Sequence, residues 1–115
     1  SDPNDYPGMI IEKSLAQGEI DVAFAWGPIA AYSASMVKSR KLKLVPLIAP
    51  NGSRTDYSIS MAVRYREPAW KKMVEDFLNK RKDKIQSLIS LYNIPQVLED
   101  GSVLIGKEKF ARTKN

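Results

Sequence analysis

A six-residue apolar run that stops at a proline is the feature that most constrains how this chain folds. Residues 20–25 read Ile-Asp-Val-Ala-Phe-Ala, and Trp26, Gly27 and Pro28 follow directly. A nearly continuous apolar strand of this length is typical of a parallel sheet that is covered on both faces. Because proline is favoured as the first residue of a helix, Pro28 predicts a helix that runs to about Arg40.

The residues after that helix predict a second strand, from Leu42 to Ala49. Pro46 lies inside it and indicates an edge strand or an irregular end, since proline cannot donate a ladder hydrogen bond. Strand, helix and strand in this order predict a right-handed parallel crossover. The expected fold class is therefore α/β. Residues 8–17 carry a weaker helical pattern that stops at Gly18.

The second half of the chain begins with a polar break, residues 51–56, which we interpret as a hinge or linker between segment 1–50 and segment 57–100. Residues 57–64 alternate as a strand. Glu67 and Pro68 open a helix, and a basic joint at 80–84 leads to a second helix, which Asp83 is expected to cap and which closes at Asn93. Residues 101–115 are expected to form a basic, flexible tail.

Composition removes several classes of function. The chain has 115 residues and neither cysteine nor histidine, which excludes thiolate or imidazole metal sites and Ser–His or Cys–His nucleophilic pairs. Glu75 and Asp76 are neighbours on a helix and therefore point in different directions. We expect no catalytic residues, no metal and no cofactor, and predict that the chain is not an enzyme. No apolar run approaches the roughly 20 residues that a membrane span needs.

Charge is unevenly distributed. Residues 1–30 hold five acids and one base, whereas the remaining residues hold 17 bases and eight acids. A basic half can mark a nucleic-acid surface. We regard nucleic-acid binding as a minor alternative, because acids are interspersed among the bases. A solvated helix surface or a face for an acidic protein partner explains the same pattern.

Residues 18–32 carry a family resemblance. The segment Gly-Glu-Ile-Asp-Val-Ala-Phe-Ala-Trp-Gly-Pro-Ile-Ala-Ala-Tyr resembles the last crossover of the second lobe in periplasmic solute-binding proteins of type II. Its Trp-Gly-Pro-Ile-Ala part is similar to the solute-binding-like J component of PQQ-dependent methanol dehydrogenase systems. The ending Tyr92-Asn93-Ile94-Pro95 follows in the expected order. Ala31, Ser33 and Asn93 depart from the family pattern and bear on the shape of the pocket.

The resemblance covers residues 7–95 and implies a periplasmic protein of which only the C-terminal part is represented. Residues 1–50 would then complete the second lobe, and residues 57–100 would return into the first. The chain starts at Ser1, without a methionine, and we expect it to be processed, tagged or cut from a longer protein. We expect the missing earlier half, or a second copy of the chain, to cover exposed sheet edges.

The candidate ligand-binding residues are placed by the same resemblance. In amino-acid-binding relatives the strand matching residues 20–25 ends near a carboxylate, whereas this chain has Trp26, which argues against an amino-acid ligand. Backbone N–H groups of Gly27 and Ile29 and the side chain of Tyr32 are candidates for binding an anion or a polar group. Ser58 and Ser60 are candidates on the return strand. Packing inside a lobe remains the alternative role for all of these residues.

Two functions follow from the resemblance. The first is a non-catalytic binding module that contacts a PQQ-dependent methanol or alcohol dehydrogenase, or its cytochrome, as partner or activation factor. The second is a solute-binding receptor that delivers a small polar metabolite to an ABC transporter. A pocket filled by Trp26 favours the first function, and an open polar cleft favours the second.

Overall fold

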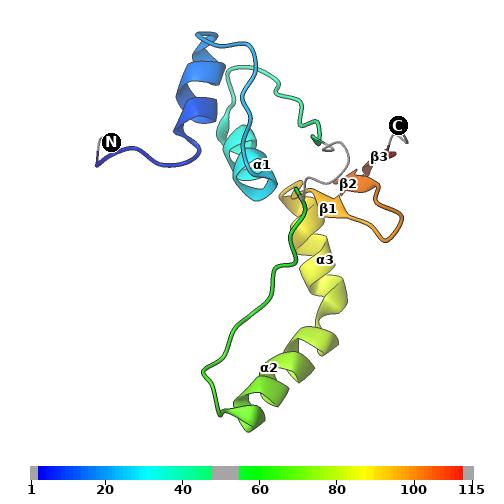
Figure 1. Ribbon diagram of the computed structural model, residues 1–115. Helices are drawn as coiled ribbons and strands as arrows, with labels where there is room; N and C mark the ends of the chain where they lie inside the picture. Colours follow the sequence, from blue (N-terminus) through cyan, green and yellow to red (C-terminus); the bar gives the residue numbers. More distant parts are fainter. Residues whose placement is uncertain (1–2, 48–54, 113–115) are drawn as a thin grey trace.

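The computed structural model describes residues 3–47 and 55–112. In chain order the elements are η1 (Ile10–Leu15), α1 (Gly27–Met36), α2 (Pro68–Lys80), α3 (Lys82–Leu91), β1 (Gln96–Val97), β2 (Val103–Ile105) and β3 (Glu108–Phe110). Figure 1 shows η1 beside α1, a small sheet near the end of α3, and α2 extending away from both. The chain thus combines helices with a three-stranded antiparallel sheet.

Helices η1 and α1 pack against each other. Ile11 of η1 is 4% exposed, and Ala31 and Ser33 of α1 are each 2% exposed. η1 is a π-helix, and the backbone N–H of Glu19 donates to the carbonyl of Ser14, five residues earlier. Gly18 then ends the turn with φ of +78°, as a glycine past a helix end commonly does. The predicted helix over residues 8–17 is confirmed.

Helix α1 begins where the sequence predicts, with Pro28 in its first turn, but it ends at Met36 instead of near Arg40. Val37 already has extended backbone angles. The Lys38 Nζ folds back and donates to the carbonyl of Ser35 at 2.8 Å. This bond satisfies one of the carbonyls that a helix end leaves without an internal partner. The basic side chain therefore stabilises the end of α1 from a position just beyond the helix.

Helices α2 and α3 match the prediction closely. α2 starts at Pro68, and only Arg81 separates it from α3. The guanidinium of Arg81 lies 3.8 Å from the centre of the Phe77 ring, a cation–π contact at the joint. Asp83 does not cap α3 as predicted: Arg81 holds the cap position and makes no side-chain cap bond. Asp83 instead lies in the first turn, where its charge suits the helix dipole.

The residues after α3 form the sheet. Asn93 takes a left-handed conformation with φ of 52°, as predicted, and β1 pairs with β2. β2 then pairs with β3 across a two-residue turn, with Ile105 opposite Glu108. Val103 and Ile105 are buried. Residues 103–110, which were expected to belong to a flexible tail, contain the strands β2 and β3.

The three strands predicted earlier in the chain do not form. Residues 20–25, the described part of 42–49, and residues 57–64 belong to no ladder. Phe24 is 80% exposed and Ile59 is 73% exposed. A buried strand needs a partner on its edges and a cover on its faces, and α1, the nearest available cover, packs on η1 instead. The parallel crossover is accordingly absent from the described residues, and the fold is mixed helix and strand without that unit.

The chain exposes an unusually large surface. Its accessible area is 9771 Å², whereas a folded monomer of its mass exposes about 6,300 Å². Its radius of gyration is 17.1 Å, against about 13 Å for a compact domain of this length. The predicted linker, residues 51–56, lies outside the described residues except for Thr55 and Asp56. Segment 57–66 leads down to α2 and runs opposite in direction to α2 and α3 (Figure 1).

Candidate functional site

A shallow groove between η1 and α1 is the first candidate site. The groove exists because Gly8 brings the start of η1 against α1: a Cβ atom at Gly8 would lie 1.9 Å from the Ser33 Oγ. A larger residue there would collide with the Ser33 side chain unless that side chain or one of the helices moves. The sequence around Gly8 therefore sets the width of the groove.

The groove has a volume of about 520 Å³ and is lined by Tyr6, Pro7, Gly8, Glu12, Pro28, Ile29, Tyr32, Ser33 and Met36. Ile29, Tyr32 and Met36 follow one another at helical spacing on one face of α1. Two of the six predicted ligand-binding residues, Ile29 and Tyr32, therefore lie at this groove. Sequence reasoning missed Met36, at the end of α1, and it missed Tyr6 and Glu12, which reach the groove only because η1 docks on α1.

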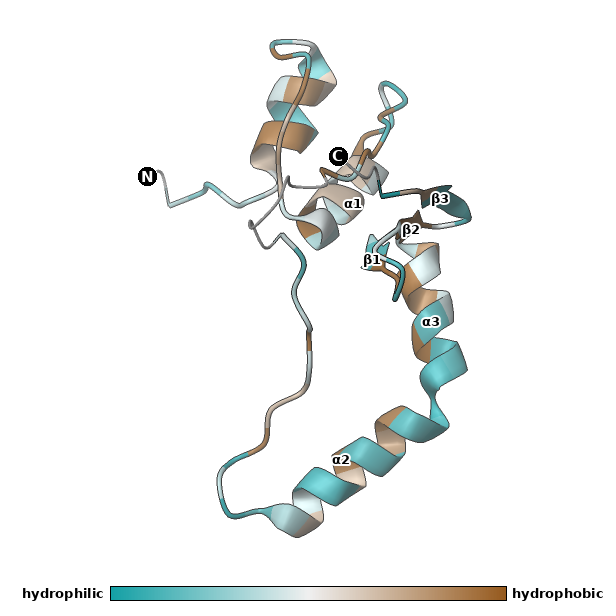
Figure 2. Ribbon diagram, turned by 45° about the vertical axis from the view of Figure 1, so that its right-hand side comes forward, coloured by the Kyte–Doolittle hydropathy of each residue, from teal (hydrophilic) through white to brown (hydrophobic). Residues whose placement is uncertain are grey.

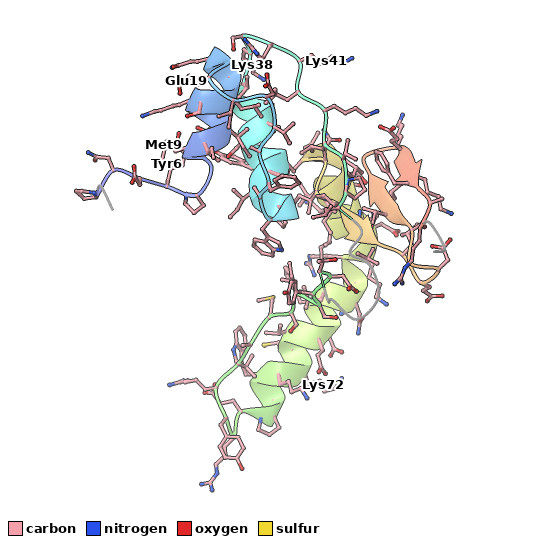
Figure 3. The ribbon with its side chains drawn as sticks, turned by 45° about the horizontal axis from the view of Figure 1, so that its top comes forward. Tyr6, Met9, Glu19, Lys38, Lys41 and Lys72 are labelled. Atoms are coloured by element: carbon pink, nitrogen blue, oxygen red, sulfur yellow. The ribbon has the colours of Figure 1, made fainter. Side chains whose placement is uncertain are left out.

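Tyr6 and Glu12 form the polar part of the groove. The Tyr6 hydroxyl donates a hydrogen bond to the Glu12 Oε2 at 2.7 Å. This bond, with a smaller contribution from lost solvent and from the negative charge of Glu12, raises the pKa of Tyr6 above its ordinary value of 10.0. Tyr6 lies at the start of η1 in Figure 3. The groove thus offers aromatic and aliphatic side chains with one carboxylate.

Trp26 and Gly27 lie at the start of α1, outside the groove. Trp26 precedes the helix and is 52% exposed. A Cβ atom at Gly27 would meet the ring of Pro95 at 3.1 Å. This contact joins the start of α1 to the residues that follow α3. It also places the non-polar ring of Pro95 beside Gly27, whose backbone N–H was predicted to bind an anion. Trp26 fills neither of the two grooves in the described part of the chain.

Ser58 and Ser60 lie elsewhere. Both are exposed on the segment that precedes α2, and neither lines a groove. The structure therefore brings Ile29 and Tyr32 together and leaves Ser58 and Ser60 apart from them. The serines were assigned to a pocket on the premise that residues 57–64 form a strand of a sheet.

A second groove, of about 620 Å³, lies between α1, the segment 41–44 and the sheet. Its lining residues are Ala31, Ala34, Ser35, Lys41, Leu42, Lys43, Leu44, Asn93, Ile105 and Glu108. None of the predicted site residues belongs to it. Asn93 approaches the turn of the hairpin closely, since a Cβ atom at Gly106 would lie 2.6 Å from the Asn93 Oδ1.

Three of the eight basic residues between Arg64 and Lys84 are paired with acids. Arg64 contacts Glu67 at 2.9 Å, Lys71 contacts Glu75 at 3.7 Å, and Lys72 contacts Asp76 at 3.0 Å. Lys72 extends from the side of α2 away from segment 57–65 (Figure 3). Such exposed pairs add little stability, but they interrupt the basic surface along the first half of α2, while the cluster at residues 80–84 takes part in none of them. The pairs therefore count against a continuous track for a phosphate backbone along the whole of α2.

Across residues 3–47 and 55–112, no group of three or more acidic side chains is arranged to hold a metal ion. In the same residues, no helix has both the length and the apolar character needed to cross a membrane. Comparison with known proteins gives no match: no protein-family model, no curated protein and no solved structure matches this chain.

Proposed function

We propose that this chain is a non-catalytic binding module that acts through contact with another protein. The observation that carries the proposal is the exposure of Val22, Phe24 and Trp26 directly before α1. Large apolar side chains gathered on a surface are typical of interaction sites, and aromatic residues commonly supply most of the binding energy there.

The identity of the partner rests on the resemblance of residues 18–32. It favours a periplasmic, type II solute-binding-like protein whose partner is a PQQ-dependent methanol or alcohol dehydrogenase, or the cytochrome of that enzyme. In this proposal residues 1–50 belong to the second lobe and residues 57–100 return into the first. The exposed run at 22–26 is the part of the motif that meets the partner.

Binding to the immobilised chain tests this proposal. A purified PQQ-dependent methanol dehydrogenase and, separately, its cytochrome are passed over the wild type and the Phe24→Ser/Trp26→Ser variant. We expect one of the two proteins to bind, and the double variant to weaken that binding at least tenfold. Val45→Ser changes an exposed apolar residue outside the motif and serves as the matched control. Equal binding of the wild type and the double variant would contradict the proposal.

The groove between η1 and α1 favours a second candidate, a receptor for a small polar solute. It has a carboxylate, two tyrosines and a largely apolar lining, a combination found in small-molecule sites. A thermal-shift screen against polar metabolites tests this function. Stabilisation by one solute, lost in Tyr32→Ala and kept in the matched control Tyr65→Ala, would support the receptor.

A further inference from the structure

We call residues Ser58–Val63 the open segment. The sequence of this segment is typical of a β-strand, but in the described residues no other strand pairs with it. Its apolar residues Ile59, Met61 and Val63 alternate with Ser58, Ser60 and Ala62, and it has no charge, no glycine and no proline. Within the described residues no backbone hydrogen bond joins it to the rest of the chain. Such a segment is a ready template for pairing with another strand.

Helix α2 adds an apolar stripe next in the chain. Trp70, Met73 and Phe77 recur at helical spacing and are exposed, while only Val74 of this stripe is buried. Figure 2 shows hydrophobic colour on both the open segment and α2. The turn at Tyr65 and Arg66 joins the two, so one partner can cover both.

We propose that the partner is a second copy of this chain, and that two copies pair antiparallel along their open segments around a twofold axis at Ser60. An interface between identical chains is self-complementary when the same patch is used on both sides. With Ser60 opposite Ser60, Ile59 lies opposite Met61 and Ser58 lies opposite Ala62. The apolar residues of both copies then share one face, as a strand period of two requires.

The residues that flank the open segment fit the same register. Asp56 of one copy lies opposite Arg64 of the other, on each side of the axis. Both residues are exposed. Arg64 also contacts Glu67 of its own chain at 2.9 Å, and a second carboxylate opposite it on the neighbouring strand adds a further favourable charge pair. A register moved by one residue places apolar residues opposite serines. A register moved by two toward Tyr57 places Asp56 opposite Ala62, whereas a move by two toward Val63 places Asp56 opposite Arg66, so the charges alone do not separate that register from the proposed one.

The chain as a whole exposes more area than a dimer interface needs. The chain exposes 9771 Å², roughly 3,500 Å² more than a folded monomer of its mass. A stable interface buries about 1,200–2,000 Å² in total over both partners. Two copies therefore need to cover only part of their excess surface.

Single cysteines test the register, because the chain has no cysteine of its own. In Ser60→Cys the two thiols lie directly opposite each other, about 4.5–5.5 Å apart between Cα atoms, within the range of a disulfide. In Ser58→Cys they lie four residues apart along the ribbon, roughly 13 Å. The two variants differ only by a shift of two residues in the same exposed segment.

Each variant of the full 115-residue chain is oxidised with oxidised glutathione, and the disulfide dimer is followed on non-reducing gels. We expect Ser60→Cys to form dimer at least tenfold faster than Ser58→Cys. Equal rates would overturn the register, and so would a faster reaction of Ser58→Cys.

Self-association of the cysteine-free chain is measured independently by sedimentation over a range of concentrations. We expect a dimer in the wild type, and at least a tenfold weaker association in Ile59→Asp, which places a carboxylate opposite Met61. Val45→Asp is the control, since Val45 is 66% exposed and Ile59 is 73% exposed. A wild type that stays monomeric, or equal weakening by the two variants, would overturn the proposal. Neither result depends on binding to a dehydrogenase.

Discussion

The helix pair η1–α1 and the open segment differ in whether another part of the same chain buries their apolar side chains. Both have regular apolar patterns, and both are bordered by turn residues. Ile11 is buried because Gly8 lets α1 approach, whereas Ile59 remains exposed because nothing in the described residues pairs with its strand. An apolar pattern therefore predicts that a residue will be buried, but it does not identify the element that buries it.

The largest expected difference between the two regions is the cost of removing an isoleucine side chain. Ile11→Ala should lower the stability of the helix pair by about 2–5 kcal/mol, because it leaves a cavity. Ile59→Ala should change it by less than about 0.5 kcal/mol, as exposed substitutions do. Amide hydrogen exchange in α1, at a concentration that keeps the chain monomeric, measures both. Similar losses in the two variants would remove the contrast between the regions.

A smaller effect is expected when the close approach at Gly8 is blocked. Gly8→Ala should destabilise the helix pair by about 1–3 kcal/mol, since the new methyl group collides with the Ser33 hydroxyl. Ser33→Ala removes the oxygen and should recover much of the loss in the double variant. Hydrogen exchange in α1 again provides the measurement. A double variant no more stable than Gly8→Ala would show that Ser33 is not the obstacle.

The smallest expected effect concerns the small sheet, in which Val103 and Ile105 are also buried. The hydroxyl and the backbone N–H of Ser102 both donate to the Asp100 carboxylate, which lowers the pKa of Asp100 below its ordinary value of 3.8. A lowered pKa contributes stability that is present above 3.8 and is lost as pH falls through the folded value.

We therefore expect the chemical shift of the Ser102 amide in an NMR titration to change as the pH falls below 3.8, with weaker protection of this amide relative to its intrinsic exchange rate at low pH. Asp100→Asn keeps an acceptor for Ser102 but does not titrate. Its Ser102 signal should stay constant over the same range. A titration in the variant equal to that in the wild type would assign the effect to another group.

The helices could be predicted from the sequence because their signals are local. Pro28 and Pro68 set the starts of α1 and α2, and Asn93 and Pro95 mark the end of α3. The predicted strands 20–25 and 57–64 could not be judged in the same way, because a strand depends on a partner that local residues do not reveal. The hairpin was missed because Val103-Leu104-Ile105 is short, although Gly106 and Lys107 form the kind of two-residue turn that joins adjacent strands.

The candidate site was predictable only in part for a related reason. Ile29 and Tyr32 follow Pro28 on a predicted helix, so their place on α1 could be inferred. Glu12 comes from a different helix, η1, and Tyr6 from the chain just before it. Nothing in the local sequence shows that η1 docks on α1 at Gly8. The serines at 58 and 60 were placed by a sheet that the described residues do not contain.

The hairpin turn at Gly106 and Lys107 has a consequence for the time course of folding. Residues that close a two-residue turn meet within about 1–10 μs, because little chain entropy is lost in bringing them together. The helix pair joins Gly8 to Ser33, and closing a loop of this length costs only slightly more entropy because the cost grows slowly with loop length. Both should reach their native form before two chains can meet at micromolar concentration. Dimerisation would then appear as a separate, slower phase whose rate rises with protein concentration. The rate of the early phase would not depend on protein concentration.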